Sequence, residues 1–229
     1  MWPPSPALRR ITSPALTPVT LIEAKAHLRV DFPDDDALIT ALISAAAGSL
    51  DPVGRPLVET QWALDLDAFP GFDTTCGGRF PYGSIERPYP DFHRLDGPAP
   101  FDRQQQIRLP APPLVAVTAV KYRDSASVVQ TLDPSIYTTF VADGGIGWLR
   151  LANAMAWPAT DGYARPVSIE FTSGYGGSGG SSVPLPGAMR AAVLLIIGGL
   201  YEQRSSFTDK SVFTNPAVEM LVSPFRVMV

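Results

Sequence analysis

The amino-acid sequence predicts an α+β fold, in which a small helical bundle from the N- and C-terminal segments carries a β-rich central insertion. Apolar residues recur at helical spacing near both ends of the chain, and they alternate with polar residues through its centre. The chain has 229 residues, 45% of them hydrophobic, which suffices for one sizeable core with a large insertion. The predicted boundaries are an extended proline-rich arm over 1–18, the bundle over 19–57 and 184–222, the insertion over 58–183 and a C-terminal tail over 223–229.

Two helices are expected after the arm. Thr20 precedes Glu23 by three residues, which is the spacing of a capping box, and this predicts a helix over residues 21–28. The aspartates at 34–36 suit the N-terminus of a second helix, where negative charge is favoured, and its apolar stripe continues to Leu50. Calcium binding is the alternative use of these aspartates, but their spacing lacks the alternating ligands of an EF-hand loop.

Alternation predicts strands in the central part. Thr60, Trp62, Leu64 and Leu66 share one side of a half-buried strand, with polar residues or alanine between them. Further strands are expected over residues 106–109, 115–123, 128–132, 137–141, 147–151 and 167–172. Beta structure therefore fills the middle of the chain.

Residues 69–106 form a predicted long loop that mixes aromatic residues with arginines. A loop of this length is uncommon unless it is functional or disordered. Interleaved aromatics and arginines can stack on single-stranded bases, but acidic residues balance these arginines and the same composition is typical of protein interfaces. We expect protein contact, through Phe80, Tyr82 and Tyr89.

The most apolar passage is AMRAAVLLIIGGLYEQR, residues 188–204. Its uncharged part, from Ala191 to Leu200, would span about 15 Å as a helix. Crossing a bilayer requires about 30 Å, and the N-terminus lacks the pattern of a signal peptide. We therefore expect a soluble chain that is not exported and makes no membrane contact.

This third helix is apolar around its whole circumference, which predicts burial on every side. Bundle packing is expected to cover the face made of Met189, Val193, Ile196 and Leu200. The face with Leu194, Leu195 and Gly198 needs cover from the insertion or from a neighbouring subunit. Gly198 and Gly199 each cost about 1 kcal/mol relative to alanine in a helix interior, so we expect another element to approach their backbone closely.

The sequence GYGGSGG places Gly174, Gly176 and Gly179 at the spacing of a dinucleotide-binding turn, after an expected strand. That fingerprint requires a helix to begin within the turn, so that its N-terminus meets the pyrophosphate. Here SSVPLP intervenes before the next helical pattern. A flexible linker is the favoured interpretation, and a nucleotide-binding enzyme is the alternative.

Few residues suit catalysis or metal binding. The two histidines, His27 and His93, are expected at the surface, and no G-x-S-x-G pattern accompanies them. The single cysteine, Cys76, cannot form an internal disulfide and lacks the partners of a zinc site, which indicates a reducing compartment. We expect no catalytic site, no metal and no cofactor. The net charge of −4 and the pI near 5.1 disfavour tight DNA binding.

Several segments form an ordered set: VTLIEAKAHLRVD, DDDALITALISAAAGSL, GRPLVETQWALDLDAFP, IRLPAPPLVAVTAVKYRD leading into QTLDPSIY, FTSGYG, and VPLPGAMRAAVLLIIGGLYEQR. Together they resemble the head-tail connector (adaptor) proteins of tailed bacteriophages and gene transfer agents. The resemblance covers most of residues 19–204. Two regions depart from the usual pattern, the longer loop 71–104 and the arm 1–18.

The resemblance implies a ring-forming structural protein without an active site, for which twelve copies are the expected number. It implies docking beneath the portal protein, contact with a stopper or other tail-proximal neck protein, and a channel that passes duplex DNA without specific binding. The implied location is the virion neck, after assembly in the host bacterial cytoplasm. The alternatives are a different neck or tail component, such as a stopper or tail terminator, and a monomeric binding module that uses the aromatic loop.

A head-to-tail ring uses two different surfaces of each subunit. The candidate contact residues are Phe80, Tyr82 and Tyr89 in the loop, Gly198 and Gly199 in the third helix, and Phe213, Leu221, Phe225 and Val227 near the C-terminus. The C-terminal segment either docks onto the portal or an adjacent subunit, or packs on its own bundle. The sequence leaves both arrangements open.

Overall fold

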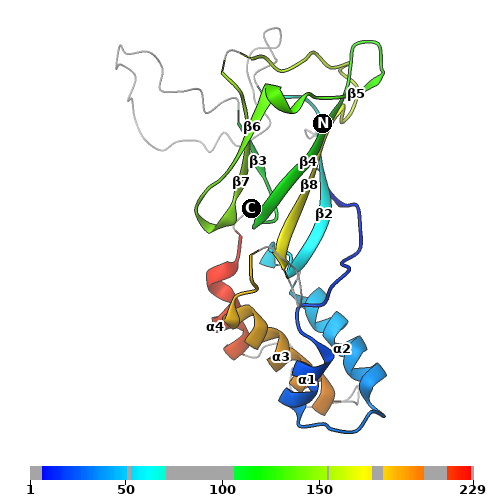
Figure 1. The fold of residues 1–229 in the computed structure, drawn as a ribbon, viewed down its shortest axis with the longest axis vertical. Coiled ribbons are helices and arrows are strands. Elements are labelled where there is room, and N and C mark those ends of the chain that lie inside the picture. The colour runs from blue at the N-terminus through cyan, green and yellow to red at the C-terminus, as the bar shows by residue number, and fades with distance from the viewer. Residues whose placement is uncertain are drawn as a thin grey trace, which may run out of the picture.

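The computed structural model describes residues 7–50, 53–70, 106–153, 155–176, 183–203 and 216–227. The helices gather at one end of an elongated molecule and the strands at the other (Figure 1). Every strand pair within these ranges is antiparallel. Segregated helices and antiparallel sheets define the α+β class, as the sequence predicts.

The helical end contains α1 (Leu21–Leu28), α2 (Asp36–Ser49), α3 (Gly187–Glu202) and α4 (Pro216–Val222). The predicted capping box is confirmed at α1, because the Glu23 amide donates to Thr20 Oγ1 at 3.1 Å and the Thr20 amide donates to Glu23 Oε2 at 2.8 Å. The helices enclose one apolar core whose fully buried members include Val19, Ala24, Ile39, Ala46, Met189, Val193 and Ile197.

The buried face of α3 differs from the predicted one. Met189 and Val193 are buried as expected, but Ala192 and Ile197 complete the face, while Ile196 and Leu200 are only half-buried. The reason is that every residue between 191 and 200 is apolar or glycine, so the hydrophobic period cannot select a face. Packing against α1, α2 and α4 selects it instead.

The sheet end contains two sheets. The five-stranded sheet has the order β1 (Ala7–Arg10), β2 (Val58–Leu66), β8 (Val167–Gly176), β4 (Leu114–Arg123) and β5 (Val129–Thr131). The three-stranded sheet has the order β3 (Gln106–Leu109), β7 (Gly147–Leu151) and β6 (Tyr137–Val141). Their inner faces share a second apolar core, which includes Leu64, Leu109, Leu149, Ile169 and Phe171.

Part of the proline-rich arm belongs to a sheet. Residues 7–10 form β1, which pairs with the edge of β2, and the Arg10 guanidinium lies 4.8 Å from the ring centroid of Trp62. The chain continues along this edge, where the Ile11 amide donates to the Gln61 carbonyl at 2.8 Å. The prolines predict an extended arm. Residues 7–10 of this arm satisfy their backbone hydrogen bonds by pairing with β2 as an added strand.

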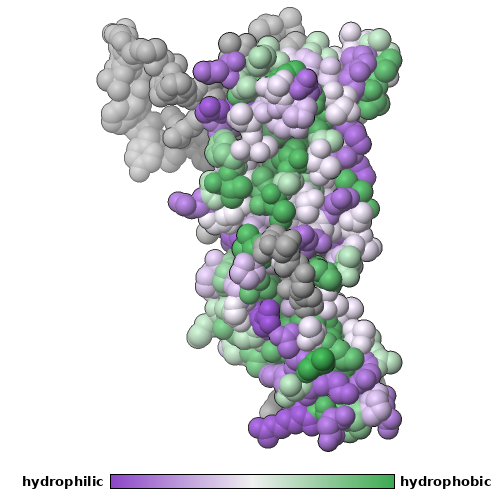
Figure 2. Space-filling view, viewed as in Figure 1, coloured by the Kyte–Doolittle hydropathy of each residue, from purple (hydrophilic) through white to green (hydrophobic). Residues whose placement is uncertain are grey.

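Hydropathy is distributed unevenly over the molecule. Figure 2 shows hydrophobic residues gathered over the sheet end and a mainly hydrophilic tip where α1 and α2 meet. Within the described ranges, no helix is both long enough and apolar enough to span a membrane.

Candidate functional site: the junction between helices and sheets

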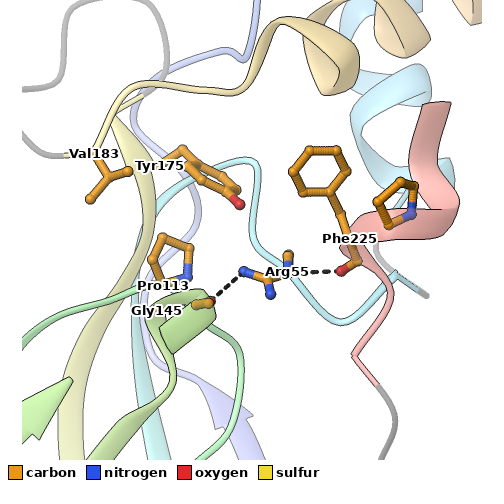
Figure 3. Close-up of a pocket in the computed structure, with 8 residues that line it drawn as sticks. Arg55, Pro113, Gly145, Tyr175, Val183 and Phe225 are labelled. Atoms are coloured by element: carbon orange, nitrogen blue, oxygen red, sulfur yellow. Dashed lines mark hydrogen bonds between the residues drawn. The ribbon is translucent and has the colours of Figure 1, made fainter. Parts of the chain in front are cut away.

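A hollow of about 470 Å³ lies where the helices meet the sheets. Its lining comes from several parts of the chain, and consists of Arg55, Pro113, Gly144, Gly145, Tyr175, Val183, Pro224 and Phe225 (Figure 3). Arg55 is the only charged side chain among these residues. The hollow therefore suits an apolar group next to a cation, and its lining contains no acid–base pair that could perform chemistry.

Arg55 joins three parts of the molecule. Its Nε donates to the Phe225 carbonyl at 2.8 Å, and its Nη1 donates to the Gly144 carbonyl at 2.8 Å, as the dashed lines in Figure 3 show. The first bond reaches the short 3₁₀ turn Ser223–Phe225 after α4, and the second reaches the turn between β6 and β7. One planar guanidinium with several donors can hold both carbonyls at once.

The C-terminal segment packs against its own chain as far as residue 227. The Val227 amide donates to the Val53 carbonyl at 3.0 Å. Its side chain lies against Gly54, where an added Cβ would sit 3.2 Å from Val227 Cβ and where φ is +78°. Leu221 and Phe225 are half-buried against the helical core. The described residues thus show the arrangement in which this segment covers its own bundle.

The glycine-rich stretch begins inside a strand. Gly174 and Gly176 lie in β8 and Tyr175 between them is buried in the helical core. Gly174 has a φ of +122°, and an added Cβ would overlap the Val58 carbonyl. The linker prediction is therefore wrong for these residues, because close backbone contact and not flexibility explains Gly174. Among the described residues no helix begins within this glycine stretch, since the next described helix begins at Gly187, and Gly179 lies outside the described residues.

The remaining predicted contact residues lie in different places. Gly198 faces α1, where an added Cβ would lie 3.5 Å from His27 Nε2 in ordinary van der Waals contact, and at Gly199 no described residue of another element comes within 4 Å of such an atom. The described residues therefore leave room for a Cβ at both positions and do not show the predicted close backbone approach. Phe80, Tyr82, Tyr89 and Phe213 lie outside the described residues, as do His93 and Cys76.

Charged side chains connect the three helices α1, α2 and α3. Glu23 pairs with Arg190 at 2.5 Å, Lys25 pairs with Asp36 at 2.5 Å, and the Tyr201 hydroxyl donates to Asp35. The aspartates at the start of α2 therefore connect this helix to α1 and α3. In the described ranges, no group of three or more His, Cys, Asp or Glu residues is suited to binding a metal.

Hydrogen bonding changes the acidity of Glu23. The Thr20 amide is the largest influence and lowers the pKa of Glu23 below 4.5, and the Thr20 hydroxyl and Arg190 act in the same direction while burial opposes them. At neutral pH the Glu23 carboxylate is therefore ionised, and it connects the N-terminal cap of α1 to Arg190 in α3.

Sequence patterns did not point to Arg55. The residue stands between two expected elements in the string GRPL, without any periodicity or motif around it. Its role depends on contacts with residues 89 and 170 positions away along the chain. Only the folded arrangement brings these carbonyls together.

Solved structures share the fold of this protein over nearly the whole chain. No protein-family model and no curated protein matches it. Solved structures do match, and in three of them 97% of this chain and 96% of the other chain are covered. A chain in the neck of an empty gene transfer agent (GTA) particle, computed with C6 symmetry, is 21% identical with a TM-score of 0.65. A chain in the virion of a native GTA particle is 23% identical at 0.64, and one in the neck of a native GTA particle, computed with C12 symmetry, is 20% identical at 0.61. The chain therefore has the fold of these particle components.

Proposed function

We propose that this protein is a structural component of a virion neck, a head-tail adaptor that forms a ring beneath the portal protein. The observation that carries the proposal is the full-length likeness of fold to chains of GTA necks. Those necks were computed with C6 and C12 symmetry, which supports a ring of repeated subunits and twelve as the expected number.

The partners follow from that position. The ring contacts the portal protein on the capsid side and a stopper or other tail-proximal neck protein on the tail side. Duplex DNA passes through its channel without specific binding, in keeping with a net charge of −4. The function is structural and needs no enzymatic activity, and assembly takes place in the host bacterial cytoplasm.

The proposal is tested in particles. A tag on this chain should label the neck in cryo-electron-microscopy class averages, and cells that lack the gene should produce filled heads without tails. A tag found along the tail, or tailed particles in the absence of the chain, would contradict the proposal.

A second experiment separates the adaptor from other neck components. The purified chain should bind isolated portal rings directly and form a collar on them. A stopper or tail terminator would bind only after another neck protein is present. Binding of NAD or ATP by calorimetry would instead revive the nucleotide-binding alternative.

A further inference from the structure

The hollow at the junction contains a positive charge without a counter-ion. The half-buried Arg55 guanidinium donates to the Phe225 and Gly144 carbonyls and forms no ion pair with a described residue. Asp143, which precedes Gly144, is exposed and does not line the hollow. Carbonyl groups carry no net charge, so the charge of Arg55 is not neutralised within the described part of the chain.

The Tyr175 hydroxyl is a second unsatisfied group in the same place. Tyr175 is 4% exposed and lines the hollow, and Figure 3 shows its hydroxyl pointing toward Arg55. The hydroxyl forms no hydrogen bond with any of the residues that the structure describes. Buried tyrosine hydroxyls ordinarily have a hydrogen-bond partner. A ligand that accepts hydrogen bonds from both Tyr175 and Arg55 would therefore complete this site.

Arg55 is held in position before any ligand binds. Its Nε and Nη1 bonds, both 2.8 Å long, join the side chain to the turn after α4 and to the turn between β6 and β7. A side chain that is already ordered loses little conformational entropy when it binds a ligand. The remaining N–H groups of the guanidinium can therefore donate to an anion in the hollow without further ordering.

The rest of the lining determines what kind of anion fits. Pro113, Val183, Pro224 and Phe225 give the hollow mainly apolar walls. Its volume of about 470 Å³ lies within the range of about 300–1,000 Å³ that ligand sites in proteins occupy. A carboxylate next to an aromatic or aliphatic group combines two acceptor oxygens with an apolar surface. This chemistry matches the two donors and the walls together.

We propose that this hollow binds an acidic peptide segment of a partner protein chain. An aspartate or glutamate of that segment accepts hydrogen bonds from Arg55 and Tyr175, and an adjacent apolar side chain packs against Phe225. The inference rests on the proposed function, because the virion neck is where this chain would meet such a partner. DNA is a poorer match for the hollow, since its backbone is bound through several phosphate contacts and Arg55 is the only cation in the lining.

Peptide binding by the isolated full-length chain tests the ligand chemistry. The probe is acetyl-Gly-Phe-Asp-Gly-amide, and a matched control peptide has Asn in place of Asp, which removes only the negative charge. An NMR titration followed at the amides of Gly145 and Val183 should show that the acidic peptide binds at least about tenfold more tightly than the control. Equal affinities, or binding of inorganic phosphate in preference to the acidic peptide, would overturn the proposal.

Tyr175→Phe tests the site without disturbing the fold. The ring stays in place and the hydroxyl has no partner to lose among the described residues, so the midpoint of urea unfolding should not fall. The affinity for the acidic peptide should nevertheless fall about tenfold. Tyr163→Phe is the matched control, at a tyrosine that is 69% exposed and lies outside the hollow, and it should change neither quantity. An unchanged peptide affinity with Tyr175→Phe would contradict the proposal.

Cross-linking in assembled particles tests whether a partner chain occupies the hollow. In a Cys76→Ser background, Val183→Cys places a thiol in the lining at a position that is 48% exposed. A maleimide–diazirine reagent should join this chain to a second polypeptide, at a peptide that mass spectrometry shows to contain Asp or Glu beside an apolar residue. Adding Tyr175→Phe should lower the yield per incorporated chain several-fold. No product, a product within one chain, attachment to DNA or an unchanged yield would each show that the proposal is wrong.

The two kinds of experiment separate this inference from the proposed function. If the chain occupies particle necks but does not bind the acidic peptide, the inference fails and the neck function stands. If the unaltered chain is absent from necks, the neck function fails, and the peptide titration still reports on the hollow of the isolated chain.

Discussion

At Gly174 a single missing side chain allows β8 to pass close to β2. The residue has a φ of +122°, and the space that a Cβ would need is taken by the Val58 carbonyl. Neither the positive φ nor the close contact with Val58 can relax unless the backbone moves. This position therefore fixes where the end of β8 meets the start of β2.

Gly174→Ala should therefore lower the free energy of unfolding by more than about 1 kcal/mol. Gly187→Ala is the matched control, because nothing lies within 4 Å of its added Cβ and it opens α3. That control should be neutral or stabilising by up to about 1 kcal/mol. Urea unfolding of the two variants checks the difference, and equal midpoints would show that the contact with Val58 does not constrain the strand.

Glu23 makes stability depend on pH through its hydrogen bonds to Thr20 and its pair with Arg190. Its pKa is lowered in the folded chain, so its contribution is fully present above about pH 4.5 and is lost as the pH falls through the lower folded value. Glu23→Gln should be less stable than the unaltered chain at pH 7, and the gap should narrow below pH 4.5. Glu219→Gln, whose partner Arg226 is 56% exposed, should show little difference at either pH. Thermal unfolding across this range measures both.

At the scale of the elements, Gly199 in the interior of α3 is not explained by the described residues. It costs helix stability, yet no described atom of another element lies within 4 Å of the place of its Cβ. Gly199→Ala should stabilise the isolated subunit by up to about 1 kcal/mol, and it should weaken ring assembly if a neighbouring subunit approaches α3 there.

Gly48→Ala in α2 is the control for that experiment. It too has nothing within 4 Å of the added Cβ, so it should stabilise the subunit without affecting assembly. Chemical unfolding and particle yield would be compared for the two variants. Normal assembly with Gly199→Ala would remove this glycine from the predicted contact residues.

The C-terminal segment depends on Arg55 for its position. Arg55→Ala removes the donor to the Phe225 carbonyl and also the donor to Gly144, so the segment after α4 should open more often. Hydrogen exchange at the Val227 amide should become at least several-fold faster, in keeping with a lost hydrogen bond worth about 1 kcal/mol. Arg226→Ala, which removes only a surface pair with Glu219, should leave that exchange rate unchanged.

For the molecule as a whole, the charge balance predicts little affinity for the DNA that would pass through the proposed ring. A net charge of −4 gives few uncompensated cations for phosphate contacts. Assembled rings should therefore not retard duplex DNA in a gel shift at moderate salt. Retardation that weakens steeply with added salt would show that basic residues line the channel.

Local patterns predicted the elements because their causes are local. The Thr20–Glu23 cap and the strands β2, β6 and β7 depend on residues a few positions apart, and the structure confirms them. The buried face of α3 could not be predicted, since its sequence is apolar on all sides and only packing distinguishes Ile197 from Ile196. The same limit applies to β1, Gly174 and Arg55, whose partners are distant in sequence. The predicted contact residues remain predictions, because the contacts they concern involve other molecules.

Val58 and Gly176 are paired residues, so the chain enters and leaves most of the sheet end at neighbouring positions. A recombination event that exchanged everything between them for another strand-rich stretch would leave the two flanking stubs at the same separation. The helical end could then stay unchanged while the sheet end diverged. Under the proposed neck function, swapping this stretch between relatives is a practical route to hybrid rings.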